Sequence, residues 1–156
     1  MPGDIVDAAT RSRMMAGIRS RDTKPEMIVR RGLHRRGLRF RLHARGLPGR
    51  PDLVFPRYRA AVFVHGCFWH GHDCPLFRWP QSRAEFWHAK IGGNIARDTD
   101  VRAQLHAASW RVLTVWECAF RGKDAIGSEA ALDAAAAWLA LGAAEGELRG
   151  NASGDC

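Results

Sequence analysis

The sequence predicts an α/β domain in which a central mixed β-sheet is flanked by helices, with the element order α-α-β-β-β-α-β-α. Two observations lead to this fold class. Three apolar runs, PDLVF, YRAAVFVHG and WRVLTVWE, are each bounded by turn residues as β-strands are. Segments with helical capping signals precede and separate these runs. At 156 residues, the chain is long enough for one domain with its own core.

The N-terminal part, residues 1–37, reads as a basic helical arm. Thr10 is the expected N-cap of a short helix with the sequence RSRMMAGIRS. Thr23 is the expected N-cap of a second helix, in which Glu26 completes a capping box. Gly37 is expected to end that helix.

Three strands are expected next. Residues 38–43, LRFRLH, alternate apolar and basic side chains with the period of a half-buried strand. Residues 51–55 and 58–66 read as a hairpin that turns at Pro56 and Arg57. The second strand of the hairpin is almost wholly apolar, which predicts a central place in the sheet.

A long helix is expected from about residue 83 to about residue 108. Ser82 and Glu85 have the spacing of a second capping box. Gly92 and Gly93 interrupt the helical pattern, so a kink or break is expected there.

The last elements are a strand at residues 110–117 and an Ala-rich helix at residues 128–142. The domain is therefore expected to span residues 1–142. Residues 143–156 are small and polar, which predicts a disordered tail.

The charge distribution indicates a nucleic-acid partner. The chain has a net charge of +8, and residues 11–50 hold 13 Lys and Arg against Asp22 and Glu26. Such a basic block suits a polyphosphate, because each phosphate contact releases counterions. The alternative is a merely solvated basic surface.

Nothing in the sequence indicates a membrane protein or a secreted one. No run of 18 apolar residues is present. The N-terminus, MPGDIVDAATRSR, lacks the apolar centre of a secretory signal. We therefore expect a cytoplasmic protein, associated with the nucleoid if its partner is DNA.

The segment HGCFWHGHDCP predicts a zinc site. Cys67, His72 and Cys74 have the spacing C-x4-H-x-C, and Cys118 follows a predicted buried strand. Three thiolates and one imidazole form the closed tetrahedral set of structural zinc sites. The alternative is that each cysteine is a small buried apolar residue.

The aromatic pair in the same segment has two interpretations. Phe68 and Trp69 can belong to a local core. They can instead form a rigid wedge presented to stacked bases. Unstacking a base step costs free energy, which a loop braced by zinc can offset more readily than a flexible one.

Asp52 at the head of the hairpin resembles the first acid of PD-(D/E)xK nucleases, with Phe63 in place of the second acid and His65 in place of the lysine. The very short patch repair (Vsr) endonucleases show the same departure. The sequence resembles that family in ATRSRMMAGIRSRDT, LPGRPDLVF, FVHGCFWHGHDC, FWHAKIGGNIARD and WRVLTVWEC, which span residues 9–118 in order.

The resemblance implies a restriction-endonuclease-like fold and a Mg²⁺-dependent endonuclease. Such an enzyme nicks one strand of duplex DNA next to the thymine of a T:G mismatch, the product of 5-methylcytosine deamination. Asp52 and the main-chain carbonyl of Val64 would bind Mg²⁺. His70 would be the general base, Asp98 would hold and polarise it, and His65 would assist at the scissile phosphate.

The resemblance also implies that Glu26 completes the acidic site and that Phe68, Trp69 and Trp87 enter the duplex around the mismatch. The four zinc ligands would be Cys67, His72, Cys74 and Cys118. Simpler roles exist for several of these residues: a helix cap for Glu26, a surface charge for Asp98. Trp87 and Asp98 are 11 residues apart, so an unbroken helix would place them on one face.

Two other functions compete with this one. A zinc-braced DNA-binding module without catalysis would explain the charge, the thiols and the aromatic residues, but not Asp52. Catalysis by the zinc itself is disfavoured, because four protein ligands leave no open position. We expect a monomer whose partner is double-stranded DNA with a T:G mismatch, and a MutL-type repair protein is a further candidate partner.

Overall fold

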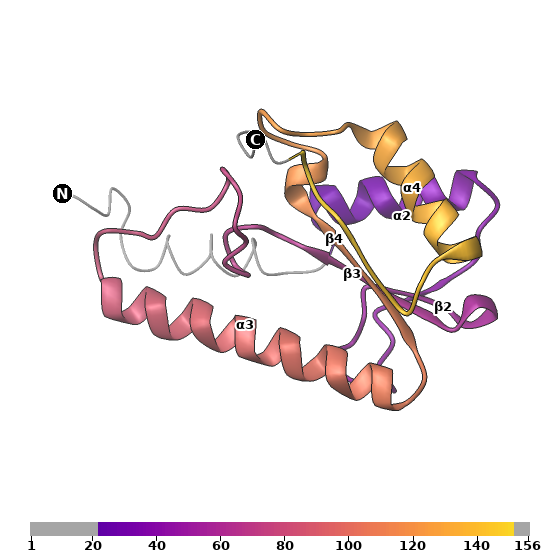
Figure 1. Cartoon of the computed structure of the whole chain (residues 1–156), viewed down its shortest axis with the longest axis horizontal. Coiled ribbons are helices and arrows are strands. Elements are labelled where there is room, and N and C mark those ends of the chain that lie inside the picture. The colour runs from indigo at the N-terminus through magenta and orange to yellow at the C-terminus, as the bar shows by residue number, and fades with distance from the viewer. Residues whose placement is uncertain (1–21, 152–156) are drawn as a thin grey trace.

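The computed structural model describes residues 22–151 and places a five-stranded sheet between helices (Figure 1). The strands are β1 (Arg41–Leu42), β2 (Leu53–Phe55), β3 (Ala60–His65), β4 (Arg111–Trp116) and β5 (Glu145–Leu148). The helices are α2 (Lys24–Arg35), α3 (Ala84–Ala107) and α4 (Ser128–Leu141), with short 3-10 turns η1 (Pro56–Tyr58) and η2 (Glu117–Ala119). The helix expected after Thr10 and the terminal Cys156 lie outside the described residues. None of the described helices is long and apolar enough to cross a membrane.

The sheet is mixed, as the sequence predicted. Its order is β1-β2-β3-β4-β5, with antiparallel pairing from β1 to β3 and parallel pairing from β3 to β5. The predicted hairpin is confirmed, with Leu53 opposite Val62. The apolar strand β3 is central, and its last residue, His65, lies opposite Trp116 of β4. The chain therefore leaves β3 and β4 at the same edge of the sheet.

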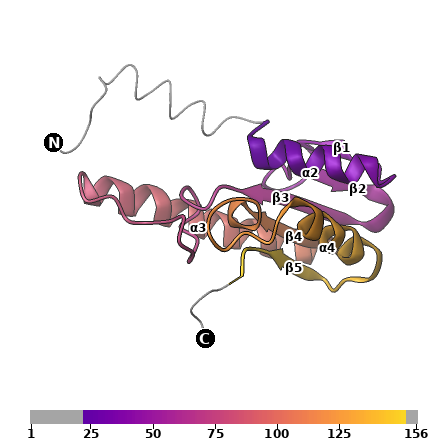
Figure 2. The ribbon, with the colours of Figure 1, turned by 90° about the horizontal axis from the view of Figure 1, so that it is seen from above.

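Helices cover both faces of the sheet (Figures 1 and 2). Helices α2 and α4 lie on one face, where Leu33 and Leu132 pack with Val62 and other strand residues. Helix α3 lies on the other face through Leu105. Gly32 allows α2 and α4 to approach closely, because a Cβ at that position would lie 2.2 Å from a methyl carbon of Leu132.

Helix α3 differs from the expectation in two respects: it is continuous, and it begins at a different cap. Gly92 and Gly93 do not break it, and a Cβ at either position would meet no neighbouring atom, so they lie on an open side of the helix. Ser82 is not the cap, since the N-cap is Arg83 with a left-handed φ of 57° and no side-chain cap bond. The N-terminal half of α3 extends past the sheet, and the loop after β3 runs beside it (Figure 1).

The expected disordered tail is wrong for residues 145–148. These residues form β5, which pairs in parallel with β4 from Val112 opposite Glu145 to Val115 opposite Leu148. Glu and Gly are poor strand formers, so the segment lacks a strand signal of its own. Main-chain hydrogen bonds to β4 and the packing of Leu148 on the core hold it in place. At residues 38–43 the strand is shorter than predicted and consists of Arg41–Leu42.

Candidate functional site

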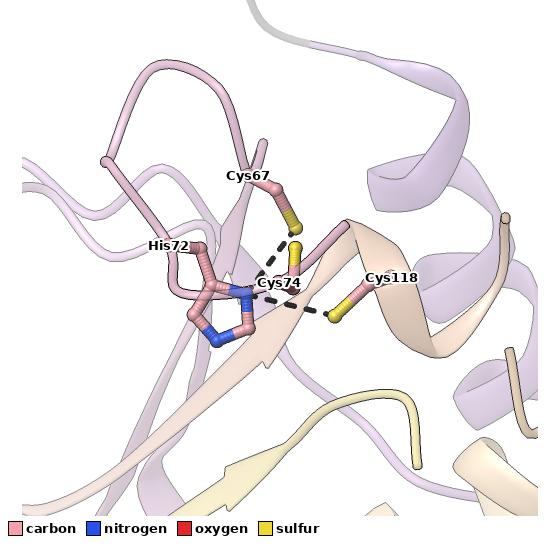
Figure 3. A group of neighbouring side chains, drawn as sticks. All are labelled: Cys67, His72, Cys74 and Cys118. Carbon is pink, nitrogen blue, oxygen red and sulfur yellow. Dashed lines mark hydrogen bonds between the residues drawn. The ribbon is translucent and has the colours of Figure 1, made fainter. Parts of the chain in front are cut away.

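Four predicted metal ligands converge at the edge where β3 and β4 end. Cys67, His72 and Cys74 come from the loop after β3, and Cys118 comes from η2, after β4; Figure 3 shows their side chains pointing toward one another. The Nδ1 atom of His72 lies 3.5 Å from Sγ of Cys67 and 3.6 Å from Sγ of Cys118. One ligand atom from each of the four lies within 4.8 Å of the others. The parallel pairing of β3 with β4 brings position 118 beside position 67.

The donor chemistry of this cluster fits a closed metal site. Cys67, His72 and Cys118 are buried, and the ring of His72 stacks on Trp116 with ring centroids 3.8 Å apart. Burial raises the pKa of the Cys67 thiol, and the neighbouring Cys118 adds to that effect. Buried thiols so close together favour a soft cation that binds them as thiolates. The cluster can therefore hold a metal ion such as zinc.

The segment after β5 contacts this cluster and the loop that carries it, which the sequence did not predict. The amide of Gly150 donates to Sγ of Cys118 over 3.3 Å. Arg149 binds both the carboxylate and the carbonyl oxygen of Asp73, at 2.8 and 2.9 Å, and so ties the cysteine loop to the end of β5. A Cβ at Gly150 would lie 2.7 Å from the carbonyl oxygen of Cys118, so this close approach requires glycine.

The predicted catalytic and aromatic residues line one cleft beside the four candidate metal ligands. The cleft has a volume of about 1060 Å³ and is formed by the start of α2, the residues directly before β2, the end of β3, the loop after β3 and one side of α3. The predicted site residues on its walls are Glu26, Asp52, Val64, His65, Phe68, Trp69, Trp87, His70 and Asp98. The tertiary structure thus brings together residues as far as 72 positions apart in the sequence, from Glu26 to Asp98.

Asp52 is held at the head of β2 by the neighbouring strand. The amide of Val64 donates to Oδ2 of Asp52 over 2.7 Å. Burial raises the pKa of Asp52 to about 6, despite this hydrogen bond, and the charge of Glu26 also raises it. A carboxyl group of raised pKa in a polar cleft indicates a functional site. A divalent cation would favour its charged form.

Two stacked histidines and an acid form a second group in the cleft. Nδ1 of His70 lies 2.5 Å from Oδ2 of Asp98, which fixes one ring nitrogen and leaves Nε2 for other partners. The ring of His65 stacks on that of His70, with centroids 3.7 Å apart. Burial lowers the pKa of His65 well below its usual value, and the charges of His70 and Arg102 contribute. His65 is therefore neutral at pH 7.

The helix-cap interpretation of Glu26 explains only part of its contacts. Its amide donates to Oγ1 of Thr23 over 3.4 Å, as predicted. Its carboxylate is 4% exposed and accepts from Arg30, from His43 and from the amide of Asp22. The side chain thus belongs to a buried polar cluster at the cleft.

The predicted wedge residues form one aromatic group. Phe68 contacts Trp69 and Trp87 edge-on, with centroids 5.2 and 5.3 Å apart, and all three side chains are half-buried. Asn94 on α3 donates to the carbonyl oxygen of Trp69 over 2.8 Å and ties the loop to the helix. Trp87 and Asp98 line the same cleft, as their spacing on an unbroken helix predicted.

Cationic residues on the walls of the cleft were missed by the sequence analysis. They are Lys24, Arg50, Lys90, Arg97 and Arg121. They come from separate elements, and no motif distinguishes them from other surface charges. Positive side chains beside carboxylates suit a phosphate backbone.

The fold and the cleft are those expected of a hydrolase that acts on nucleic acid, since histidines, carboxylates, cations and aromatic side chains line one opening. The comparisons with known proteins specify the family. The family model described as DNA mismatch endonuclease Vsr matches residues 3–76. The DNA mismatch endonuclease Vsr of Escherichia coli (strain K12) is 46% identical over 136 residues, which cover 87% of this chain and 87% of that protein.

Two nicking enzymes are also similar. Type II nicking enzyme V.XorIIP of Xanthomonas oryzae pv. oryzae is 50% identical over 115 residues, 74% of this chain and 85% of that protein. Type II nicking enzyme V.NmeAIP of Neisseria meningitidis is 40% identical over 120 residues, 77% of this chain and 86% of that protein. The chain belongs to the Vsr family of DNA mismatch endonucleases, which confirms the family that its motifs indicated.

Proposed function

We propose that this protein nicks one strand of duplex DNA next to the thymine of a T:G mismatch, by Mg²⁺-dependent hydrolysis of a phosphodiester. The product would enter very short patch repair of deaminated 5-methylcytosine. The observation that supports the proposal most is the single cleft that holds Asp52, the His70–Asp98 pair and the aromatic group. The names of the related mismatch and nicking endonucleases support the same activity.

The sheet supports a restriction-endonuclease-like core. In that arrangement a hairpin carries the acidic residues and a parallel strand follows it. Here β2 and β3 form the hairpin, β4 pairs in parallel with β3, and Asp52 comes directly before β2.

Asp52 and the main-chain carbonyl of Val64 would hold Mg²⁺. The bond from the Val64 amide orients the Asp52 carboxylate, so this part of the site is formed in advance. When bound, Mg²⁺ supplies charge neutralisation at the phosphate and lowers the pKa of water. Glu26 would complete the acidic side of the cleft.

His70 would take the proton from the attacking water. The contact with Asp98 places the Nδ1 proton of His70 toward the carboxylate, so that Nε2 is the basic nitrogen. Asp98 then stabilises the imidazolium that forms. His65, neutral and stacked on His70, would donate a hydrogen bond at the scissile phosphate.

The aromatic group would enter the duplex around the mismatch. Phe68, Trp69 and Trp87 brace one another edge-on, and Asn94 fixes the loop that carries two of them. Unstacking a base step costs a few kcal/mol, and a rigid wedge can offset this cost by stacking its own rings on the exposed bases. We propose that zinc at Cys67, His72, Cys74 and Cys118 provides this rigidity.

The proposal includes a monomer bound to nucleoid DNA in the cytoplasm, with a MutL-type repair protein as a candidate partner. Size-exclusion chromatography with light scattering, with and without mismatched duplex, would measure the stoichiometry.

A panel of end-labelled duplexes tests the function directly. The duplexes would carry T:G, T:C, A:C or no mismatch in varied flanking sequences, with Mg²⁺ or with none added. We expect one cut, on the thymine strand, in the T:G duplexes with Mg²⁺. Binding of T:G duplexes without any cut would indicate a zinc-braced binding module and would exclude the enzyme.

A further inference from the structure

We propose that His43 is a positioning residue that holds the Glu26 carboxylate in place beside Asp52. The inference rests on the proposed function, because it assigns a role in the same cleft. None of the sequence motifs includes His43. In the structure it contacts two acidic residues, Glu26 of α2 and Asp52 directly before β2.

The Glu26 carboxylate is anchored on both oxygens. Nε2 of His43 lies 2.6 Å from Oε2, and Nη2 of Arg30 lies 2.7 Å from the same atom. The other oxygen, Oε1, accepts from the amide of Asp22 over 3.1 Å. The side chains of Glu26 and His43 are 4% and 14% exposed, so these contacts are shielded from water.

The backbone of His43 connects this anchor to Asp52. The His43 amide donates to the carbonyl oxygen of Asp52 over 3.1 Å, next to the two paired positions of β1 and β2. Glu26 and Asp52 line the same cleft, and the charge of Glu26 contributes to the raised pKa of Asp52. His43 thus contacts one acid through its ring and the other through its main chain.

The conformation of His43 is consistent with this role. Its φ is +46°, in the left-handed region that residues other than glycine rarely adopt. Histidine and asparagine are among the residues that tolerate this region best. Strained backbone conformations persist where surrounding contacts hold them, and functional sites are rich in them. Here the turn at the end of β1 directs the ring at Glu26.

A fixed Glu26 has a chemical consequence. A carboxylate that completes the acidic side of the cleft must keep one orientation while the phosphate is in place, because small displacements of such groups reduce rates strongly. Without His43, Arg30 would be the one side chain among the described residues that still holds Oε2. Glu26 would then sample other rotamers, and the rate of the chemical step would fall while DNA affinity would not.

Two substitutions separate the side-chain contact from the backbone conformation. His43→Asn keeps a residue that tolerates positive φ, but its amide is too short to reach Glu26. His43→Gln keeps an N–H donor at a reach similar to that of Nε2. We expect His43→Asn to lower kcat about 10-fold or more at saturating T:G duplex and Mg²⁺, with Kd for the duplex changed less than about twofold. His43→Gln should recover kcat to within about threefold of wild type.

A matched control exists outside the cleft. His106 pairs with Glu145 at 2.8 Å, so His106→Asn removes another histidine–glutamate contact without touching the proposed site. It should leave kcat unchanged. An unchanged kcat in His43→Asn, or an equal loss in His43→Asn and His43→Gln, would overturn the inference.

A double-mutant cycle tests whether His43 acts through Glu26. If it does, Glu26→Gln combined with His43→Asn should be about as slow as Glu26→Gln alone, because the second change removes nothing further. Fully multiplicative losses would contradict the role. A wild-type protein that never nicks T:G duplexes would refute the proposed function instead. The free energies of unfolding of the same variants in urea would then test the contact itself. If Glu26 and His43 interact, the two losses of stability should be non-additive.

Discussion

His65 and His70 stack face to face, with ring centroids 3.7 Å apart and an angle of 3° between the ring planes. Two imidazolium ions at this distance would repel each other strongly, so the geometry disfavours a positive charge on both rings at once. Burial lowers the pKa of His65, whereas His70 has Asp98 as a partner for the charged form. In the proposed reaction, His70 is therefore the ring expected to take up the proton.

Loss of the proposed base should abolish nicking and spare binding. We expect His70→Ala to lower kcat about 10²- to 10⁴-fold, the usual contribution of a general base. Asp98→Asn should have a smaller effect, because His70 remains but its tautomer and orientation are less fixed. Gel-shift assays without Mg²⁺ should give a Kd within a few-fold of wild type. A variant His70→Ala that still nicks at the wild-type rate would contradict the assigned role.

The raised pKa of Asp52 predicts a pH-dependent cost to stability. The pKa of Asp52 in the folded protein is about 6, above the usual value of 3.8 for an unperturbed aspartate. The protonated Asp52 carboxyl therefore contributes stability in full below about pH 4, and this contribution is lost as pH rises through about 6. In Mg²⁺-free buffer, Asp52→Asn should be more stable than wild type by about 2 kcal/mol at pH 8 and by little at pH 4. Urea unfolding at both pH values measures the difference, and a variant less stable at pH 8 would refute this account.

The same group should make Mg²⁺ dependence vary with pH. Protons and the cation compete for the Asp52 carboxylate, whose pKa is about 6 without metal. The Mg²⁺ concentration for half-maximal nicking should rise about 10-fold for each unit of pH below about 6 and change little above it. Nicking titrations at several pH values test this expectation. A half-maximal concentration independent of pH between about 5 and 7 would exclude Asp52 as the metal ligand.

Removal of one cluster ligand should remove the metal and destabilise the domain. Cys118 is buried, lies 3.6 Å from His72 and accepts from the Gly150 amide. We expect Cys118→Ser to reduce zinc from about one ion per chain to a small fraction and to lower Tm by about 10 °C or more. Elemental analysis and thermal unfolding provide the measurements. Cys156→Ser is the matched control and should retain wild-type zinc, whereas full zinc content in Cys118→Ser would exclude Cys118 as a ligand.

Truncation of the wedge should weaken recognition of the mismatch. Stacking of an aromatic side chain on a base contributes about 1–3 kcal/mol, so Trp69→Ala should raise Kd for T:G duplex about 5- to 150-fold. Affinity for fully paired duplex should change less, since phosphate contacts dominate it. Leu141, 87% exposed near the end of α4, provides a control in Leu141→Ala. Equal losses for matched and mismatched duplex would argue against a wedge at the mismatch.

The local patterns of the sequence predicted most of the elements. Thr23 and Glu26 marked the start of α2, and the apolar run of β3 predicted its central place in the sheet. The spacing from Cys67 to Cys74 indicated three donors that a short loop can bring together. These predictions succeed because capping, strand burial and chelation by one loop depend on residues close in sequence.

The roles of His43, Gly150 and β5 could not be predicted in this way. The contacts from His43 to Glu26 and from Gly150 to Cys118 join residues 17 and 32 positions apart, and no motif links them. β5 has little strand propensity and is held by its hydrogen bonds to β4. The sequence by itself determined which side chains are available for a metal, a base and a wedge. Packing of the helices on the sheet alone decided which of them share a cleft, because contacts between distant segments depend on the whole core.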